Sequence, residues 1–188
     1  MRILIMSDTH GDLAAWRKVL ERFGEGIDYI LHAGDVLYHP FGLPIPSTYD
    51  AIGLAAAMND SPCPMVIARG NCDADVFSVV LRWPLQDPIA FLHLGDLRIL
   101  VTHGHRITRS EFADLARWYG AQLVVFGHIH KPVLDIEGNA LILNPGSVSL
   151  SQYAPEGKAV QTAALLSDRL VEVFDVDTGE IVARGSVQ

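Results

Sequence analysis

The sequence predicts an α/β fold in which two stacked mixed β-sheets lie between outer helices, a four-layer α/β/β/α sandwich. In the first half of the chain, short apolar runs alternate with segments of helical periodicity, which is typical of parallel strands joined by crossover helices. In the last third, short apolar runs are separated by turn residues, which is typical of antiparallel strands. Two stacked sheets with helices outside them would bury both kinds of segment.

The first half is expected to supply three strands, at 2–7, 28–33 and 64–69. A helix after Asp12 is indicated by apolar residues at helical spacing, and Gly24 and Gly26 are expected to end it. Its apolar residues are Leu13, Trp16, Val19, Leu20 and Phe23. Ser47 is expected to cap a second helix. That helix carries Ile52, Ala55, Ala56 and Met58.

The second half is expected to contain one helix, at 110–119, and mainly antiparallel strands. The expected strands lie at 89–94, 97–102, 122–126, 133–136, 140–143, 163–166, 170–176 and 180–184. Gly95-Asp96 and Glu137-Gly138-Asn139 are the hairpin signals between them.

Length and composition favour one domain that spans 1–188. The chain has 188 residues, of which 49% are hydrophobic, enough for a substantial core. A net charge of −8 argues against an extended nucleic-acid surface or an anionic membrane as partner. A nucleotide in a small cleft stays compatible, because metal ions would reverse the local charge. With two cysteines, no signal-peptide core and no apolar membrane span, a cytoplasmic protein is expected.

Five clusters of acidic residues, amides and histidines follow the expected strands. In open α/β sheets, ligands collect at the carboxyl ends of strands. Carboxylates and imidazoles cost free energy when they are buried together without a compensating charge. The clusters are Asp8-Thr9-His10, Gly34-Asp35, Gly70-Asn71-Cys72-Asp73, Thr102-His103-Gly104-His105 and Gly127-His128-Ile129-His130. Their candidate metal ligands suit two divalent ions about 3.5–4 Å apart that share a carboxylate. These ligands are Asp8, His10, Asp35, Asn71, His103, His128 and His130.

A purely structural interpretation exists for single members of this set. Asp8, Asp35 and Asn71 belong to the residue types that cap helices. Capping does not explain why all five clusters occur together and in order, so we expect a metal-filled cleft.

Three further residues are candidates for contact with substrate or with the ligands. His105 is expected beside a ligand or a bound phosphate, and otherwise as a loop histidine. His39 lies in the proline-rich loop at 37–46 and is a candidate to touch substrate. Cys72 is either a neighbour of the site or a small apolar filler. The residues expected to be structural are His32, Cys63 and His93.

The clusters also carry a family resemblance. Their order matches D-x-H, G-D, G-N, H and G-H-x-H, so the chain resembles the calcineurin-like metallophosphoesterase superfamily over nearly its whole length. It looks most similar to the small single-domain bacterial and archaeal phosphodiesterases, which share its G-N-C-D and T-H-G-H segments and Asn144-Pro145-Gly146-Ser147. The eukaryotic retromer scaffold subunit resembles the same branch.

The resemblance implies the sandwich fold and a division of the ligands between two metals. One metal would be held by Asp8, His10, Asp35 and His130. The other would be held by Asp35, Asn71, His103 and His128. Asp35 would bridge them together with a hydroxide that attacks phosphorus directly, and the residues closest to catalysis would be Asp35, Asn71 and His103.

Cys72 departs from the pattern of the family. Many members carry a histidine after the motif asparagine, and it is thought to protonate the leaving group. A thiol, with a pKa of about 8.5, is a poorer hydrogen-bond donor than an imidazolium. Cys72 therefore weighs against general-acid catalysis in this chain.

The sequence thus favours a dinuclear metal-dependent phosphodiesterase that acts on a small phosphodiester. Nucleotide-like phosphodiesters belong to this substrate class. A phosphomonoesterase is the alternative among enzymes, and Cys72 weighs against poor alkyl leaving groups. A non-catalytic scaffold is the alternative from another class, and the full set of ligands weighs against it. Manganese is expected first as the metal, with iron, nickel or zinc as alternatives. The physiological substrate, the role of 37–46 and the oligomeric state, including a homo-oligomer, stay open.

Overall fold

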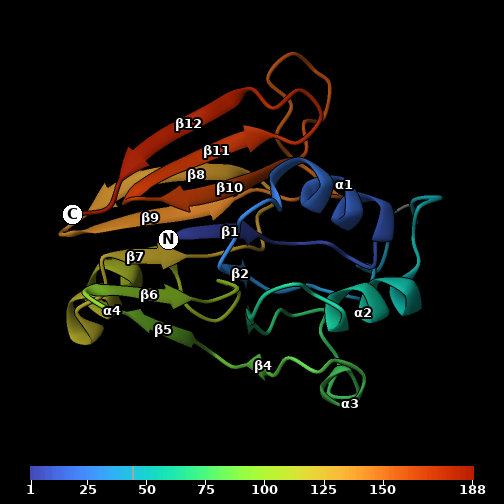
Figure 1. Ribbon diagram of the computed structural model, residues 1–188, viewed down its shortest axis with the longest axis horizontal. Coiled ribbons are helices and arrows are strands. Elements are labelled where there is room, and N and C mark those ends of the chain that lie inside the picture. The colour runs from blue at the N-terminus through green and yellow to red at the C-terminus, as the bar shows by residue number, and fades with distance from the viewer. Residues whose placement is uncertain (44) are drawn as a thin grey trace.

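The structure is a computed structural model that describes residues 1–43 and 45–188 and contains two mixed β-sheets (Figure 1). The seven-stranded sheet consists, in spatial order, of β12 (Ile181–Ser186), β11 (Leu170–Asp175), β10 (Thr162–Ser167), β1 (Arg2–Met6), β2 (Tyr29–His32), β3 (Met65–Ala68) and β4 (Leu85–Gln86). The five-stranded sheet consists of β5 (Ala90–Leu94), β6 (Leu97–Val101), β7 (Leu123–Val125), β9 (Ala140–Pro145) and β8 (Pro132–Glu137).

Both sheets combine a parallel part with antiparallel edges. In the larger sheet β1, β2, β3 and β4 run parallel, whereas β10, β11 and β12 pair antiparallel. In the smaller sheet β6, β7 and β9 run parallel, and β5 and β8 pair antiparallel at the two edges. The predicted change from α/β to antiparallel pairing along the chain is therefore confirmed.

Helices lie on the outer faces of the stacked sheets. They are α1 (Leu13–Phe23), α2 (Ala51–Asn59), α3 (Phe77–Val80), the 3₁₀ turn η1 (Arg109–Glu111) and α4 (Phe112–Tyr119). α1 and α2 pack against the larger sheet and α4 against the smaller one. This arrangement confirms the predicted α/β/β/α layers.

Alternation along β1 shows how the layers are held together. Ile3 and Ile5 point into the core between the two sheets, where they meet residues of β6 and β7. Leu4 and Met6 point the other way and pack against α1 and α2. Each such side chain contributes roughly 1.5–3 kcal/mol when fully buried, so both faces of the strand fix its position.

Two helix caps show which aspartates serve the helices. Asp12 caps α1, since its Oδ1 accepts the N–H of Ala15 at 2.9 Å. Asp50 caps α2 by accepting the N–H of Gly53 at 2.8 Å, so the predicted cap at Ser47 is wrong. Asp50 is held there because its own N–H donates to the carbonyl of Gly11 at 2.8 Å.

Two short elements, β4 and α3, have no counterpart in the sequence prediction. β4 has two residues and α3 is one turn whose N-cap, Val76, makes no side-chain capping bond. The helix expected at 110–119 begins as the 3₁₀ turn η1 and becomes α-helical at Phe112. In the part of the chain that the structure describes, no helix has the length and apolarity needed to cross a membrane.

Candidate metal centre

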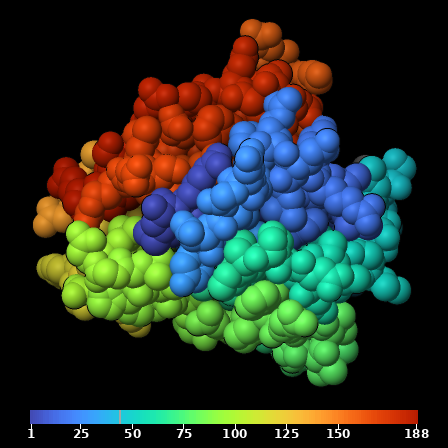
Figure 2. Space-filling view, viewed as in Figure 1, coloured from blue at the N-terminus to red at the C-terminus, as the bar shows by residue number. Residues whose placement is uncertain are grey.

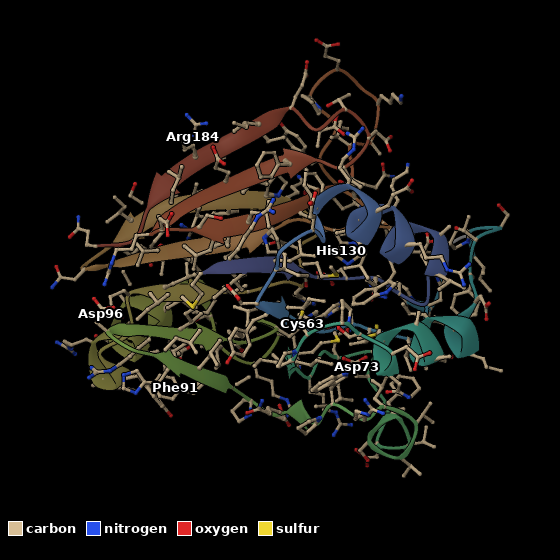
Figure 3. The ribbon with its side chains drawn as sticks, viewed as in Figure 1. Cys63, Asp73, Phe91, Asp96, His130 and Arg184 are labelled. Carbon is tan, nitrogen blue, oxygen red and sulfur yellow. The ribbon has the colours of Figure 1, made fainter. Side chains whose placement is uncertain are left out.

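The five clusters lie in loops that follow β1, β2, β3, β6 and β7, and these loops meet. The N–H of Asp8 donates to the carbonyl of Gly34 at 3.0 Å, and the N–H of Gly127 donates to the carbonyl of His103 at 3.2 Å. A link between the two sheets comes from the N–H of His128, which donates to Oδ2 of Asp8 at 3.1 Å. Figure 3 labels His130 in this region, on the side of the sheets nearer α1 and α2.

Unusual backbone conformation is concentrated at the candidate ligands. In the described part of the chain, seven residues other than glycine have positive φ, and five of them are candidate ligands. Those five are Asp8 (φ 55°), His10 (45°), Asp35 (57°), His128 (71°) and His130 (53°). Such conformations cost of order 1–3 kcal/mol each and cluster at functional sites. The packing of the fold thus maintains a strained arrangement that aims these side chains at one place.

Two glycines allow the loops to approach closely enough. A Cβ on Gly70 would lie 2.1 Å from Oδ1 of Asp35, and a Cβ on Gly127 would lie 2.1 Å from Oγ of Ser7. A larger residue at either position would push the carboxylates of the site apart.

Three histidines are oriented by the same kind of hydrogen bond. In each of them Nδ1–H donates to a backbone carbonyl, which leaves the lone pair of Nε2 free to face the centre. This is the arrangement by which proteins orient imidazoles that bind metal. The acceptors are the carbonyls of Tyr38 for His10 (2.9 Å), Ala33 for His103 (2.7 Å) and Leu150 for His130 (2.7 Å).

The Nε2 atoms converge on two carboxylates. Nε2 of His130 lies 3.1 Å from Oδ1 of Asp8, and Nε2 of His10 lies 3.7 Å from the same oxygen. Oδ2 of Asp35 lies 3.8 Å from Nε2 of His10 and 3.4 Å from Nε2 of His103, so this carboxylate stands between two groups of histidines. The three imidazole Nε2 atoms and the two carboxylates therefore point into one small volume.

The donor set fits a divalent cation. Nε2 of His10 and Nε2 of His130 are 3.1 Å apart, and each ring already uses its Nδ1 proton elsewhere, so two lone pairs face each other. Oδ1 of Asp8 is buried and has no hydrogen-bond donor among the residues 1–43 and 45–188. Lone pairs without protons and a buried carboxylate oxygen are what a metal ion would satisfy.

Without a cation, protons compensate the buried charge. Burial works to lower the pKa of His103, but the hydrogen bond to Asp35 and the charges of Asp8 and Asp35 outweigh it and raise that pKa to about 9. Burial also works to lower the pKa of His130, but the interaction with Asp8 outweighs burial and raises that pKa. The pKa of Asp35 lies below its usual range, because its interaction with His103 outweighs the effect of burial. The centre therefore selects positive charge.

Asn71 and His128 lie at the open edge of this centre. Both are exposed. Oδ1 of Asn71 lies 3.0 Å from Nε2 of His103, and the ring of His128 lies 5.1 Å from the ring of His103. These two candidate ligands are thus next to His103 and leave the centre accessible from solvent.

Asp73 is the main residue that sequence reasoning did not assign. It is buried, and its carboxylate accepts three backbone N–H groups from two separate loops: Asp35 at 2.9 Å, Val36 at 2.8 Å and Gly70 at 2.8 Å. It therefore ties the loop that carries Asp35 to the loop that carries Asn71. Its place in the G-N-C-D segment was the available signal.

A second support comes from the loop after β9. Oγ of Ser147 donates to the carbonyl of Asp8 at 2.8 Å and accepts the N–H of Leu150 at 2.8 Å. Nδ2 of Asn144 donates to the carbonyl of Gly127 at 2.7 Å. The turn around Pro145 thus holds the backbone of two clusters.

The secondary candidates differ in their distance from the centre. Cys72 is half-buried, and its N–H donates to Oδ1 of Asp35 at 2.8 Å. Burial and the charge of Asp35 raise the pKa of its thiol to about 12. The ring of His105 lies 5.3 Å from that of His103 and 6.3 Å from that of His128, so it borders the open edge.

His39 and the histidines expected to be structural lie away from the converging atoms. His39 is buried behind His10, with ring centroids 6.5 Å apart, and its Nε2 lies 3.0 Å from the carbonyl of Leu43. His32 is buried and bonds to Oγ1 of Thr9 at 3.1 Å, whereas His93 is exposed on β5. Both placements agree with a structural interpretation.

Comparison with known proteins gives likenesses over the whole chain. The profile described as "Calcineurin-like phosphoesterase superfamily domain" matches residues 1–167. Phosphodiesterase YfcE of Escherichia coli strain K12 is 30% identical over 188 residues, which cover 100% of this chain and 98% of that protein. Phosphodiesterase MJ0936 of Methanocaldococcus jannaschii is 26% identical over 153 residues, which cover 78% of this chain and 83% of that protein.

Solved structures agree with the sequence matches. The structure of the phosphoesterase YfcE from Escherichia coli superposes with a TM-score of 0.85 at 28% identity and covers 100% of both chains. A Vps29 mutant from Entamoeba histolytica gives a TM-score of 0.65 at 23% identity over 100% of both chains, which shows a common fold only. The family resemblance predicted from the motifs is thereby confirmed.

Proposed function

Because the chain belongs to the calcineurin-like phosphoesterase superfamily, we propose that it is a phosphodiesterase that uses two divalent cations to hydrolyse a small phosphodiester. The observation that carries the proposal is the convergence of three oriented Nε2 lone pairs on the carboxylates of Asp8 and Asp35. The names of YfcE and MJ0936, both phosphodiesterases, support the choice of a diester over a monoester.

The ligands divide into two sets that share Asp35. We assign the first cation to Asp8, His10, Asp35 and His130. We assign the second cation to Asp35, Asn71, His103 and His128. The division is supported by Oδ2 of Asp35, which faces His10 on one side and His103 on the other.

When bound, the two cations would supply an acidified water as nucleophile and positive charge that offsets the charge of the phosphate. The residues of the chain orient this chemistry. Nδ1–H of His10, His103 and His130 anchors each ring to a carbonyl, so no ring must rotate during the reaction. Asn71 and His128 form the exposed edge across which a phosphate reaches the centre.

We place Cys72 beside the leaving group, because it stands where many members of the family carry the histidine that is thought to protonate it. In the metal-free protein, burial and the charge of Asp35 raise the pKa of its thiol to about 12, so the thiol carries its proton at neutral pH. A thiol is a weak hydrogen-bond donor, so departure of the leaving group depends mainly on its own basicity. The enzyme should therefore prefer activated esters.

Hydrolysis of bis(4-nitrophenyl) phosphate by metal-free protein, with and without added Mn²⁺, tests the proposal. We expect activity that requires the metal and that exceeds the activity on 4-nitrophenyl phosphate. Asp35→Asn should abolish it, whereas Asp175→Asn, on β11, should leave it unchanged. Equal activity of the Asp35→Asn variant and the wild type at matched metal content would overturn the assignment.

A further inference from the structure

An apolar groove opens on the surface between α2 and α3. It has a volume of about 380 Å³ and is lined on one side by Ile52 and Ala56 and on the other by Val76 and Val80. Ile52 is 86% exposed and Val76 is 58% exposed, so large apolar side chains stand open to solvent here. Figure 2 shows the face on which the two helices lie side by side. Exposed apolar side chains that gather along a groove favour a binding site.

The walls of the groove are fixed to each other. Nδ2 of Asn59, on α2, donates to the carbonyl of Val80 at 2.9 Å. Its Oδ1 accepts the N–H of Arg82 at 2.7 Å. The groove is therefore preformed, and both polar groups of Asn59 are already used.

The groove borders residues that support the candidate metal centre. Tyr38 lines it, and the carbonyl of Tyr38 accepts the Nδ1–H of His10. Tyr49 also lines it, and a Cβ on Gly11 would lie 2.3 Å from Cε2 of Tyr49, so this ring rests on the residue next to His10. On the other side, the loop that carries Asn71 leads directly into α3.

The chemistry of the lining selects the ligand. Among the described residues that line the groove, none is charged, and Asn59 is the only amide. A second phosphate would find no cation there, and only the hydroxyl groups of Tyr38 and Tyr49 could bond the polar edge of a nucleobase, whose other polar groups would be costly to bury. An apolar, preferably aromatic, group suits such a surface, and pockets of about 300–1,000 Å³ are the usual size for small ligands.

We propose that this groove binds an apolar ester arm of the phosphodiester substrate while the phosphate lies at the metal centre. The inference rests on the proposed function and narrows its substrate class to diesters with an aryl or similarly apolar arm. The groove would then act through substrate affinity and leave the chemistry at phosphorus to the metal centre.

Isothermal titration of the Mn²⁺-loaded protein with methylphosphonate and 1-naphthylphosphonate tests the inference, because each probe has a phosphate-like head and a single arm. We expect naphthylphosphonate to bind the wild type at least about 10-fold more tightly, from burial of one aromatic group. Ala56→Trp, which fills the groove, and Val80→Asp, which places a charge in it, should each remove this preference. Neither variant should change the Kd of methylphosphonate.

Ala14→Trp is the matched control, since Ala14 is also an exposed alanine on a helix, α1. It should leave both affinities unchanged. Equal affinity of the wild type for the two probes would overturn the groove assignment and leave the proposed function standing. Failure of both probes to bind would overturn the two together. Loss of a dimer in Ala56→Trp on sedimentation, with the naphthyl preference intact, would assign the groove to a second copy of the chain instead.

Discussion

Replacement of Asp73 by asparagine should weaken metal binding although Asp73 touches no metal in the proposed centre. Its Oδ2 accepts the N–H groups of Asp35 and Gly70, and its Oδ1 accepts the N–H of Val36 at 2.8 Å. An amide oxygen can replace Oδ2, but its NH₂ group would then face the N–H of Val36. One charge-assisted hydrogen bond is lost and one buried donor is left unpaired, which costs about 1.5–3 kcal/mol.

The expected loss of metal affinity follows from the position of Val36 in the loop that carries Asp35. Val36 adjoins Asp35, so a repelled Val36 N–H moves the bridging carboxylate. Outer residues that orient metal ligands typically contribute about 10–100-fold in affinity. We therefore expect the Asp73→Asn variant to bind Mn²⁺ about 10–100-fold more weakly and to lose about 1.5–3 kcal/mol of unfolding free energy.

Two assays separate positioning from simple stabilisation. Urea unfolding of the metal-free protein gives the change in stability, and competition with a fluorescent chelator gives the Kd for Mn²⁺. Asp175→Asn is the matched control, because Oδ1 of Asp175 also accepts two backbone N–H groups, at 2.7 and 3.1 Å, in a turn of its own. The amide oxygen of the variant can still accept both bonds, so this control should keep its stability and its metal affinity, and it shows that the loss of one negative charge alone does not weaken metal binding. An Asp73→Asn variant that is destabilised but binds Mn²⁺ as the wild type does would refute the reasoning.

Three further predictions address the bridge, the thiol and a buried histidine. Asp35→Asn removes the negative charge shared by both cations. We therefore expect elemental analysis to find at least one metal lost, with the circular dichroism spectrum unchanged. Full metal content in this variant would contradict the bridging role. Cys72→Ser should change the rate of aryl diester hydrolysis only slightly. Cys72→His should selectively accelerate the hydrolysis of esters with poor leaving groups, since a well-placed general acid contributes about 10²–10⁴-fold. Abolition of all cleavage in Cys72→Ser at normal metal content would show that the thiol is essential. Burial lowers the pKa of His32 from 6.5 to about 4, so its contribution to stability is complete above pH 6.5 and is lost as the pH falls towards 4. This amounts to about 3 kcal/mol, and urea unfolding of metal-free His32→Gln between pH 4 and 7 should show a correspondingly flatter slope than the wild type; parallel slopes would contradict it.

The sequence carried enough information for the architecture and for the candidate ligands. The strand β1 is a run of apolar residues buried on both faces, and α1 repeats Leu13, Trp16 and Val19 at helical spacing, so both periods could be read directly. The ligand types follow strands, and parallel strands bring their carboxyl ends together. The convergence of Asp35 and His103 could therefore be expected before any distance was known.

The parts that were not predicted depend on contacts between distant segments. Asp73 binds N–H groups of two loops that no local pattern connects. The cap of α2 is Asp50 because the loop after β1 holds its backbone, and Ser47 lacks that contact. The groove exists because α3, one turn long, lies beside α2, and a single turn has too few residues to show helical periodicity.

The central claim is that Asp35 bridges two cations, one bound by His10 and His130 and the other bound by His103 and His128. A crystal structure of the Mn²⁺-loaded protein, with anomalous scattering recorded at the manganese edge, tests it most directly. The account predicts two anomalous peaks about 3.5–4 Å apart. Both peaks should lie within coordination distance of the carboxylate of Asp35. His10 and His130 should bind one ion, and His103 and His128 the other. A single peak in a metal-saturated crystal, or two peaks with Asp35 bound to only one of them, would contradict the account.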